Sequence, residues 1–224
     1  MNQNSWETTP SSFAETVELA ENFAKQEIVR EMEEKQLYYH TLDHAMAVKR
    51  RSNLIFQAIK PTLQSSQSST ELNRLESIIA LCAVAHDMVQ NFSQRDKIKT
   101  PRKRIPGVSE VATANKLIEY LTDLNQRLSV NPFKSSILFQ KEDLAIIEDA
   151  ILATVCDLDP QAGKATYSFS SHSIYQPYLY DYQPKISIVG KIIALADLGT
   201  LGIDGVKPFI QEGVLVFLED NLDV

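Results

Sequence analysis

Histidine is scarce in this chain, yet three of its four histidines fall in two short segments that also carry acids. His40 and His44 stand in YYHTLDHA, and His86 is followed directly by Asp87 in AVAHDMV. Neighbouring side chains on a helix diverge by about 100°, so a buried His-Asp pair needs a group between them that both can reach. A metal ion meets this need and offsets the cost of burying an ionised carboxylate. An isolated His-Asp pair is more often a helix end with a solvent-facing acid, so the pair alone does not establish a metal site.

A third segment completes a pattern with the first two. In IALADLGT, Asp197 ends a run of apolar residues, where a capping or ion-paired carboxylate is also a possible interpretation. The ordered segments YYHTLDHA, AVAHDMV and IALADLGT resemble the H…HD…D signature of the HD superfamily of metal-dependent phosphohydrolases, over roughly residues 37–200. The resemblance implies an all-α, single-domain helical bundle of the HD-domain and phosphodiesterase-like type.

The same resemblance makes His44, His86, Asp87 and Asp197 the ligands of one divalent metal ion. Two imidazoles and two carboxylates leave positions for water on a six-coordinate ion, which suits Mn, Fe, Co, Ni or Mg better than a closed Zn site. The donor set does not fix the metal, and Zn stays open. Beyond the signature only His172 remains, which argues against a second site built from histidines. A water-coordinated second ion bridged by Asp87, as in the phosphodiesterase branch, stays open.

Three side chains are candidates for proton transfer. The stretch YHTLDH is similar to YHNxxH of the cyclic-nucleotide phosphodiesterase branch, and by this resemblance His40 would protonate the leaving oxygen. Thr41 stands where that branch has asparagine, and His40 can instead simply end a turn beside Tyr39. Asp87 or Glu110 can take a proton from the attacking water. Glu110 can equally be a surface glutamate favoured by the positive end of its helix.

A basic segment begins eight residues after Asp87. From Arg95 to Arg104 it holds six basic residues and one acid, in a chain whose net charge is -7. Such a segment can bend over a metal and hold substrate phosphates, or it can be an ordinary solvated loop. The candidate substrate-binding residues are Arg95, Lys99, Arg102, Lys103 and Arg104.

Helices are predicted for the segments that carry these residues. The first spans 11–36, with Ser12 as its N-cap and Glu15 reaching back to it. The second begins near Thr41 and is expected to end near Lys60, before Pro61. A third begins at Glu71 after a polar loop over 64–70, and its second half is apolar on nearly every face, which predicts the core helix. Later helices are predicted from near Ser109, over 141–155, over 185–202 and around 206–222, with an irregular excursion over 157–185.

Composition sets the class of protein. With 224 residues, 44% of them hydrophobic, and only seven glycines, the chain predicts one helical domain over 1–224, whose metal-binding core is 37–200. Its acidic total disfavours nucleic acid and anionic membranes as partners. No apolar run of about 20 residues and no signal peptide occur, so no membrane association is expected. Cys82 and Cys156 lie in apolar runs, which predicts buried free thiols and a cytoplasmic location.

These features predict a metal-dependent phosphohydrolase that cleaves a phosphomonoester or phosphodiester of a small molecule, a nucleotide above all, with a metal-activated water. The alternative is a non-catalytic HD module that binds metal and nucleotide as a sensor. Gln90 keeps this alternative open, because the 5′-deoxynucleotidase branch is expected to carry a catalytic glutamate there. A third hypothesis, an interaction protein whose basic loop touches RNA, conflicts with the acidic total. The sequence leaves homo-oligomerisation open.

Overall fold

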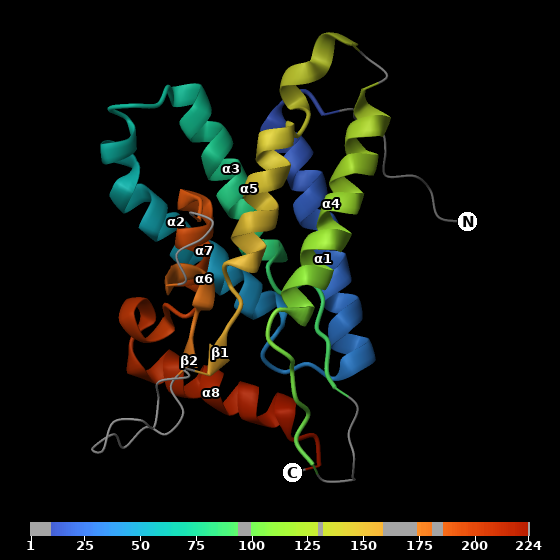
Figure 1. The fold of residues 1–224 in the computed structure, drawn as a ribbon, viewed down its shortest axis with the longest axis vertical. Helices are drawn as coiled ribbons and strands as arrows, with labels where there is room; N and C mark the ends of the chain where they lie inside the picture. Colours follow the sequence, from blue (N-terminus) through green and yellow to red (C-terminus); the bar gives the residue numbers. More distant parts are fainter. Residues whose placement is uncertain (1–9, 94–99, 130–131, 159–173, 181–185, 224) are drawn as a thin grey trace.

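The computed structural model describes residues 10–93, 100–129, 132–158, 174–180 and 186–223. The described part of the chain is mostly helical, as predicted (Figure 1). Its longer helices are α1 (Phe13–Lys35), α2 (Leu42–Leu63), α3 (Ser69–Ala85), α4 (Val108–Leu128), α5 (Lys141–Leu152), α7 (Ile188–Asp197) and α8 (Val206–Asp220). Its shorter elements are a 3₁₀ helix η1 (Pro132–Ile137), a single turn α6 (Pro177–Tyr180), a π-helix η2 (Thr200–Asp204) and the strands β1 (Asp157–Leu158) and β2 (Ile174–Tyr175).

The helix α3 is the core of the bundle. It packs against α1, α2, α5 and α7, and α8 lies across one end of the bundle (Figure 1). The run from Leu81 to Ala85 has no exposed surface, which confirms that the second half of this helix is buried on every side. Burial all round is possible because each side of α3 faces another helix rather than water. The end of α3 therefore lies deep in the molecule.

The predicted helix starts are confirmed at two N-caps. Ser12 accepts a hydrogen bond from the amide of Glu15, and Thr41 accepts one from the amide of His44. The carboxylate of Glu15 differs from the prediction, because it bonds the amide and hydroxyl of Ser11 rather than Ser12. The cap at Thr41 matters most, since it sets the first turn of α2 and with it the direction of the His44 side chain.

Several predicted helix boundaries were wrong by a few residues. The helix predicted over 141–155 ends at Leu152, and the one predicted over 185–202 spans Ile188–Asp197. The helix α2 continues past Pro61 to Leu63, and the amide of Gln64 still donates to the carbonyl of Lys60. Proline removes only its own amide from the ladder, so a final turn can follow it. The helix α3 begins at Ser69, before Glu71, because Ser68 and Glu71 form a capping box.

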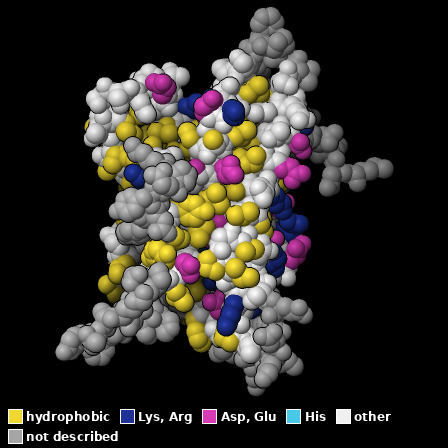
Figure 2. Space-filling model, in the orientation of Figure 1, with side chains coloured by type: hydrophobic (Ala, Val, Ile, Leu, Met, Phe, Trp, Pro, Cys, Tyr) yellow, Lys and Arg dark blue, Asp and Glu magenta, His cyan; other side chains and the backbone are white. Residues whose placement is uncertain are grey.

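Charged and hydrophobic side chains gather on different parts of the surface. In the face that Figure 2 shows, charged side chains gather along the right edge, over α1 and α4, while hydrophobic side chains occupy much of the centre. Among the described residues both cysteines are free thiols, as predicted. Cys82 is buried, whereas Cys156 is partly exposed, so its predicted burial was wrong. No helix in the described ranges combines the length and the apolar character that crossing a bilayer requires.

Candidate metal centre

Four predicted ligands, from three helix ends, converge in the interior. His44 stands in the first turn of α2, His86 and Asp87 follow the last residue of α3, and Asp197 is the last residue of α7. One ligand atom from each of the four lies within 4.8 Å of all the others. This arrangement can hold a metal ion, and the predicted convergence of these side chains is confirmed.

The distances define a compact site. The Nε2 atom of His44 lies 3.3 Å from the Nε2 of His86, 3.3 Å from Oδ2 of Asp87 and 3.3 Å from Oδ1 of Asp197. The Nε2 of His86 lies 2.9 Å from Oδ2 of Asp87 and 3.5 Å from Oδ1 of Asp197. Two imidazole nitrogens and two carboxylate oxygens thus face one point, which is the donor set of a divalent transition metal or Mg²⁺.

The tautomer of His86 is fixed by its surroundings. Its Nδ1 lies 3.0 Å from the carbonyl oxygen of Ala83 and donates to it, so Nε2 is the ring nitrogen that faces the other three ligands. A second hydrogen bond of this kind is the usual support of a metal-bound histidine. In His44 the Nδ1 atom is buried and has no hydrogen-bond partner in the described part of the chain.

The electrostatics of the cluster favour charge compensation. Burial raises the pKa of Asp197, but hydrogen bonds from His44 and His86 outweigh it and bring that pKa to about 2. Burial likewise opposes the ionisation of Asp87, yet His86 and His40 hold its pKa well below the usual range. Two carboxylates therefore stay ionised in a buried place, where they need positive charge beside them. The histidines supply it in this structure, and a divalent cation bound among the four side chains would supply it in their place, so these residues fit the predicted metal.

Gln90 holds the second oxygen of Asp87. Its Nε2 lies 3.2 Å from Oδ1 of Asp87, and its side chain is 1% exposed. The backbone around it is tied to α1, because its amide donates to Glu31 and its carbonyl accepts from Lys35. With Oδ1 bonded in this way, Oδ2 is the oxygen that faces the imidazoles. The glutamine is therefore a positioning residue for a ligand of the cluster.

Gln90→Leu is expected to weaken metal affinity about tenfold, because it keeps the side-chain volume and removes the donor to Asp87. Titration of metal into chelator-treated protein measures this. The matched control is Gln176→Leu, since Gln176 is also buried and donates to the carbonyl of Ala194. Equal metal affinities of the two variants would show that Gln90 does not position Asp87.

Arg51 fixes the backbone at Asp197, and sequence reasoning missed it. Its side chain is 1% exposed and donates to the carbonyl oxygens of Ala196, at 3.2 Å, and Asp197, at 3.4 Å. It also pairs with Asp204 at 2.7 Å and Glu212 at 2.6 Å. It therefore joins α2 to the end of α7, to η2 and to α8. The available signal was its position seven residues after His44, which puts both on one face of α2.

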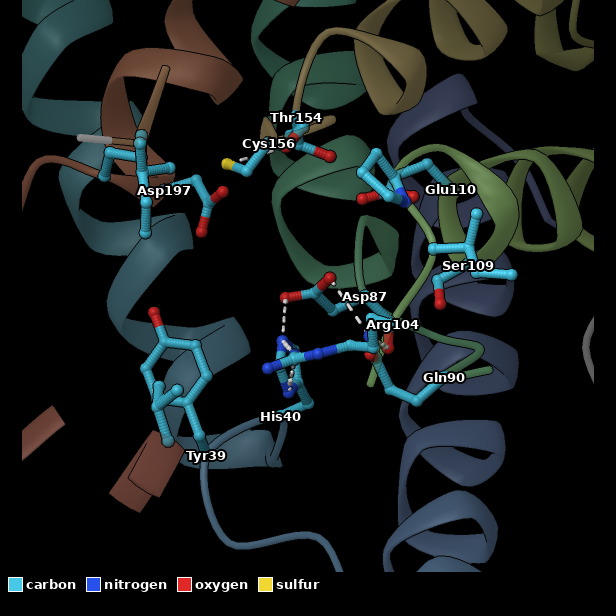
Figure 3. Close-up of a pocket in the computed structure, with 15 residues that line it drawn as sticks. Tyr39, His40, Asp87, Gln90, Arg104, Ser109, Glu110, Thr154, Cys156 and Asp197 are labelled. Atoms are coloured by element: carbon cyan, nitrogen blue, oxygen red, sulfur yellow. Dashed lines mark hydrogen bonds and ion pairs between the residues drawn. The ribbon is translucent and has the colours of Figure 1, made fainter. Parts of the chain in front are cut away.

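A pocket opens beside the cluster. It has a volume of about 280 Å³ and is lined by His40, Asp87, Arg104, Glu110 and Asp197 together with apolar side chains. Figure 3 shows Asp197 and Glu110 on opposite sides of the pocket, with Asp87 between them and His40 below. The pocket gives a ligand access to two of the four ligand residues.

His40 is held by a residue that sequence reasoning also missed. Its Nδ1 lies 2.5 Å from Oε1 of Glu219, which is fully buried on α8. The other carboxylate oxygen of Glu219 accepts the backbone amides of Tyr38, Tyr39 and His40. Burial raises the pKa of Glu219, but these hydrogen bonds outweigh it and lower that pKa to about 2. The ring of His40 is thereby fixed, with its Nε2 3.7 Å from Oδ2 of Asp87.

Glu110 and Cys156 complete the polar wall of the pocket. Glu110 lies in the first turn of α4, and burial raises its pKa, with Asp87 and Asp197 adding to the effect. It is therefore turned toward the acids of the cluster rather than to open solvent. Burial also raises the pKa of the Cys156 thiol, with the same two acids contributing. Both side chains line the pocket beside Asp87 and Asp197 (Figure 3).

Only part of the basic segment lies at the pocket. Of the predicted substrate-binding residues, Arg95 and Lys99 lie outside the described residues. Arg104 lines the pocket, where its Nη1 lies 2.7 Å from Nε2 of His40, and the side chain of Lys103 is exposed.

Arg102 is not brought to the pocket. It is 9% exposed, and its guanidinium donates to the carbonyl oxygens of Lys35, Gln36 and Glu219. It also stacks over the ring of Phe92, with 4.0 Å to the ring centroid. These contacts use its donors to join the end of α1 to the end of α8.

Comparisons with protein-family models, with curated proteins and with solved structures gave no match for this chain. Its function is therefore inferred from the geometry of the site together with the resemblance of the sequence to the H…HD…D signature.

Proposed function

We propose that this chain is a metal-dependent phosphohydrolase of the HD superfamily that cleaves a small phosphorylated molecule, in the first place a nucleotide. One observation carries the proposal: two imidazoles and two carboxylates from three separate helix ends face a single point beside a pocket. Two carboxylates and two imidazoles buried within hydrogen-bond distance of one another form a donor set that a divalent cation can bridge, which supports a bound metal ion over a purely structural role.

The four ligand residues would hold one divalent ion. Such an ion supplies an activated water and neutralises charge on phosphoryl oxygens. The chain's own groups account for the remaining requirements. Arg104 offers a guanidinium to the non-bridging oxygens of a phosphate, for which its planar fork is suited.

Proton transfer is assigned to His40 and Glu110. The carboxylate of Glu219 fixes the His40 ring through Nδ1, and Arg104 bonds its Nε2 in the structure. Once the Arg104 guanidinium turns to a substrate phosphate, Nε2 is the atom that would carry the proton given to the leaving oxygen. Glu110, with its raised pKa, faces the same pocket and can accept a proton from the attacking water. Placing an acid and a base on different walls matches the two ends of an in-line displacement.

The size and lining of the pocket limit the substrate. A volume of about 280 Å³ suits a molecule no larger than a nucleoside monophosphate. The lining also includes apolar side chains, on which a nucleobase or another flat apolar group can pack. Its apolar residues are Ile105, Pro106, Ile174, Leu198 and Val216.

Metal reconstitution tests the proposal. Protein stripped with chelator is expected to be inactive, and Mn, Fe, Co, Ni, Mg or Zn added singly to restore cleavage of one compound in a panel of phosphomonoesters, phosphodiesters and nucleotides. Phosphate release is the measurement. Cleavage that persists without metal, or metal content unchanged in Asp87→Ala, would contradict the proposed site.

The second candidate is a sensor that binds metal and nucleotide without turnover. Gln90 favours it, because an amide bonded to Asp87 cannot act as a proton acceptor in place of a glutamate. Tight nucleotide binding by the metal-loaded protein, with no product from any compound in the panel, would identify this function.

A further inference from the structure

The helix α8 is built with its apolar face turned outward. Its outer face consists of Val206, Phe209, Ile210, Gly213, Val214 and Phe217, which recur at helical spacing along one stripe. The large side chains of this face are between 49% and 62% exposed. Its acids point the other way, where Glu212 pairs with Arg51 and Glu219 with His40. Such a stripe marks an interaction surface.

The apolar area is close to what a stable dimer needs. The π-helix η2 packs against α8 and adds Leu201 and Ile203, which are 49% and 39% exposed. Half-exposed side chains of this size offer roughly 100 Å² each, so the patch offers on the order of 700 Å² per copy, against about 800 Å² per partner in a standard interface. A polar ligand or nucleic acid has no complementary groups here.

A glycine stands at the middle of this face. Gly213 is the midpoint of the helix Val206–Asp220, and a Cβ added there would meet nothing within 4 Å. Glycine inside a helix costs about 1 kcal/mol relative to alanine, and the fold of a single copy does not require it. A missing side chain at the centre of an exposed apolar face allows a second backbone to approach closely.

The face is complementary to itself. Aromatic rings stand four residues before and four residues after Gly213, at Phe209 and Phe217. When two copies of α8 cross antiparallel at their glycines, each Phe209 meets a Phe217. A two-fold interface needs this self-matching pattern.

We propose that the chain forms a two-fold homodimer in which the outer faces of two α8 helices cross antiparallel at Gly213. The helix that makes the contact is the one that supplies Glu219 to His40 and Glu212 to Arg51. The dimer therefore braces the helix that positions both groups. The inference does not depend on the proposed reaction.

Light scattering after size-exclusion chromatography tests the proposal. The natural chain, of 25.2 kDa, is expected to run at twice that mass. Phe217→Glu is expected to raise the dimer dissociation constant at least tenfold, because it buries a charge at the centre of the contact. Leu54→Glu is the matched control, since Leu54 is 50% exposed on α2 and should leave the dimer intact. A single-chain mass for the natural protein overturns the proposal.

A cross-link tests the crossing point without disturbing the fold. Gly213→Cys places a thiol at an open surface position, and in the proposed dimer two such thiols face each other on the symmetry axis. Mild oxidation is expected to convert this variant, but not Leu54→Cys, to a covalent dimer on a non-reducing gel. If Gly213→Cys dimerises no faster than the control, the α8 interface is wrong. If the natural chain is monomeric, the face serves a different protein.

Discussion

Asp197→Ala is expected to lower metal affinity at least about a hundredfold, more than the loss of a residue that only supports a ligand. Asp197 is the one ligand that comes from α7, and its Oδ1 lies 3.3 Å and 3.5 Å from the imidazole nitrogens of His44 and His86. Without it the two imidazoles retain only Asp87 as an acidic partner. Metal content after dialysis and the loss of phosphate release measure the effect.

Thermal unfolding supplies a second measurement that does not depend on a known substrate. A ligand at 100 times its dissociation constant stabilises a folded protein by about 2.7 kcal/mol, so the natural chain should melt at a higher temperature when metal is added. The Asp197→Ala variant should not. Asp123→Ala is the control, because Asp123 is exposed on α4. If both variants respond alike to metal, Asp197 is not a ligand.

The resemblance to the H…HD…D signature singled out the four residues, and their local contexts explain why their side chains converge. His44 follows an N-cap at Thr41, and His86 and Asp87 end an apolar run that has to be buried. Asp197 ends a second apolar run. Helices with buried ends bring such side chains together at one place inside the bundle. The helical class and the N-caps at Ser12 and Thr41 were predictable for the same local reasons.

The partners of these residues were not predictable, because they depend on where distant helices pack. Glu219 reaches His40 only because α8 crosses the end of the bundle with its acids inward and its apolar residues outward. The usual amphipathic rule predicts the reverse orientation.

The predicted role of Arg102 in substrate binding was wrong for a similar reason. A run of basic residues indicates a solvated or substrate-binding loop, yet the guanidinium of Arg102 is used by backbone carbonyls of α1 and α8.

Arg51→Met is expected to lower the free energy of unfolding by about 3 kcal/mol, because it removes a buried cation from two acids and two carbonyl oxygens. Burial opposes the charged form of Arg51, but hydrogen bonds with Asp204 and Glu212 raise its pKa, so it remains a cation throughout. Urea denaturation measures the loss. The matched control is the neighbouring Arg50→Met, which also loses a pair with Asp204 but stands on the surface, 51% exposed, and should cost under about 1 kcal/mol.

The Arg51→Met variant also tests whether Arg51 positions Asp197 in addition to stabilising the fold. Its Nη1 bonds the carbonyls of Ala196 and Asp197, where the negative end of α7 favours a cation, so its loss frees the backbone that aims the Asp197 carboxylate. Metal affinity should therefore fall together with stability in Arg51→Met, while a purely structural residue would change stability alone. Arg51→Lys should recover part of the stability through its charge but little of the affinity, because one ammonium cannot span the two acids and the carbonyl pair that the guanidinium fork reaches.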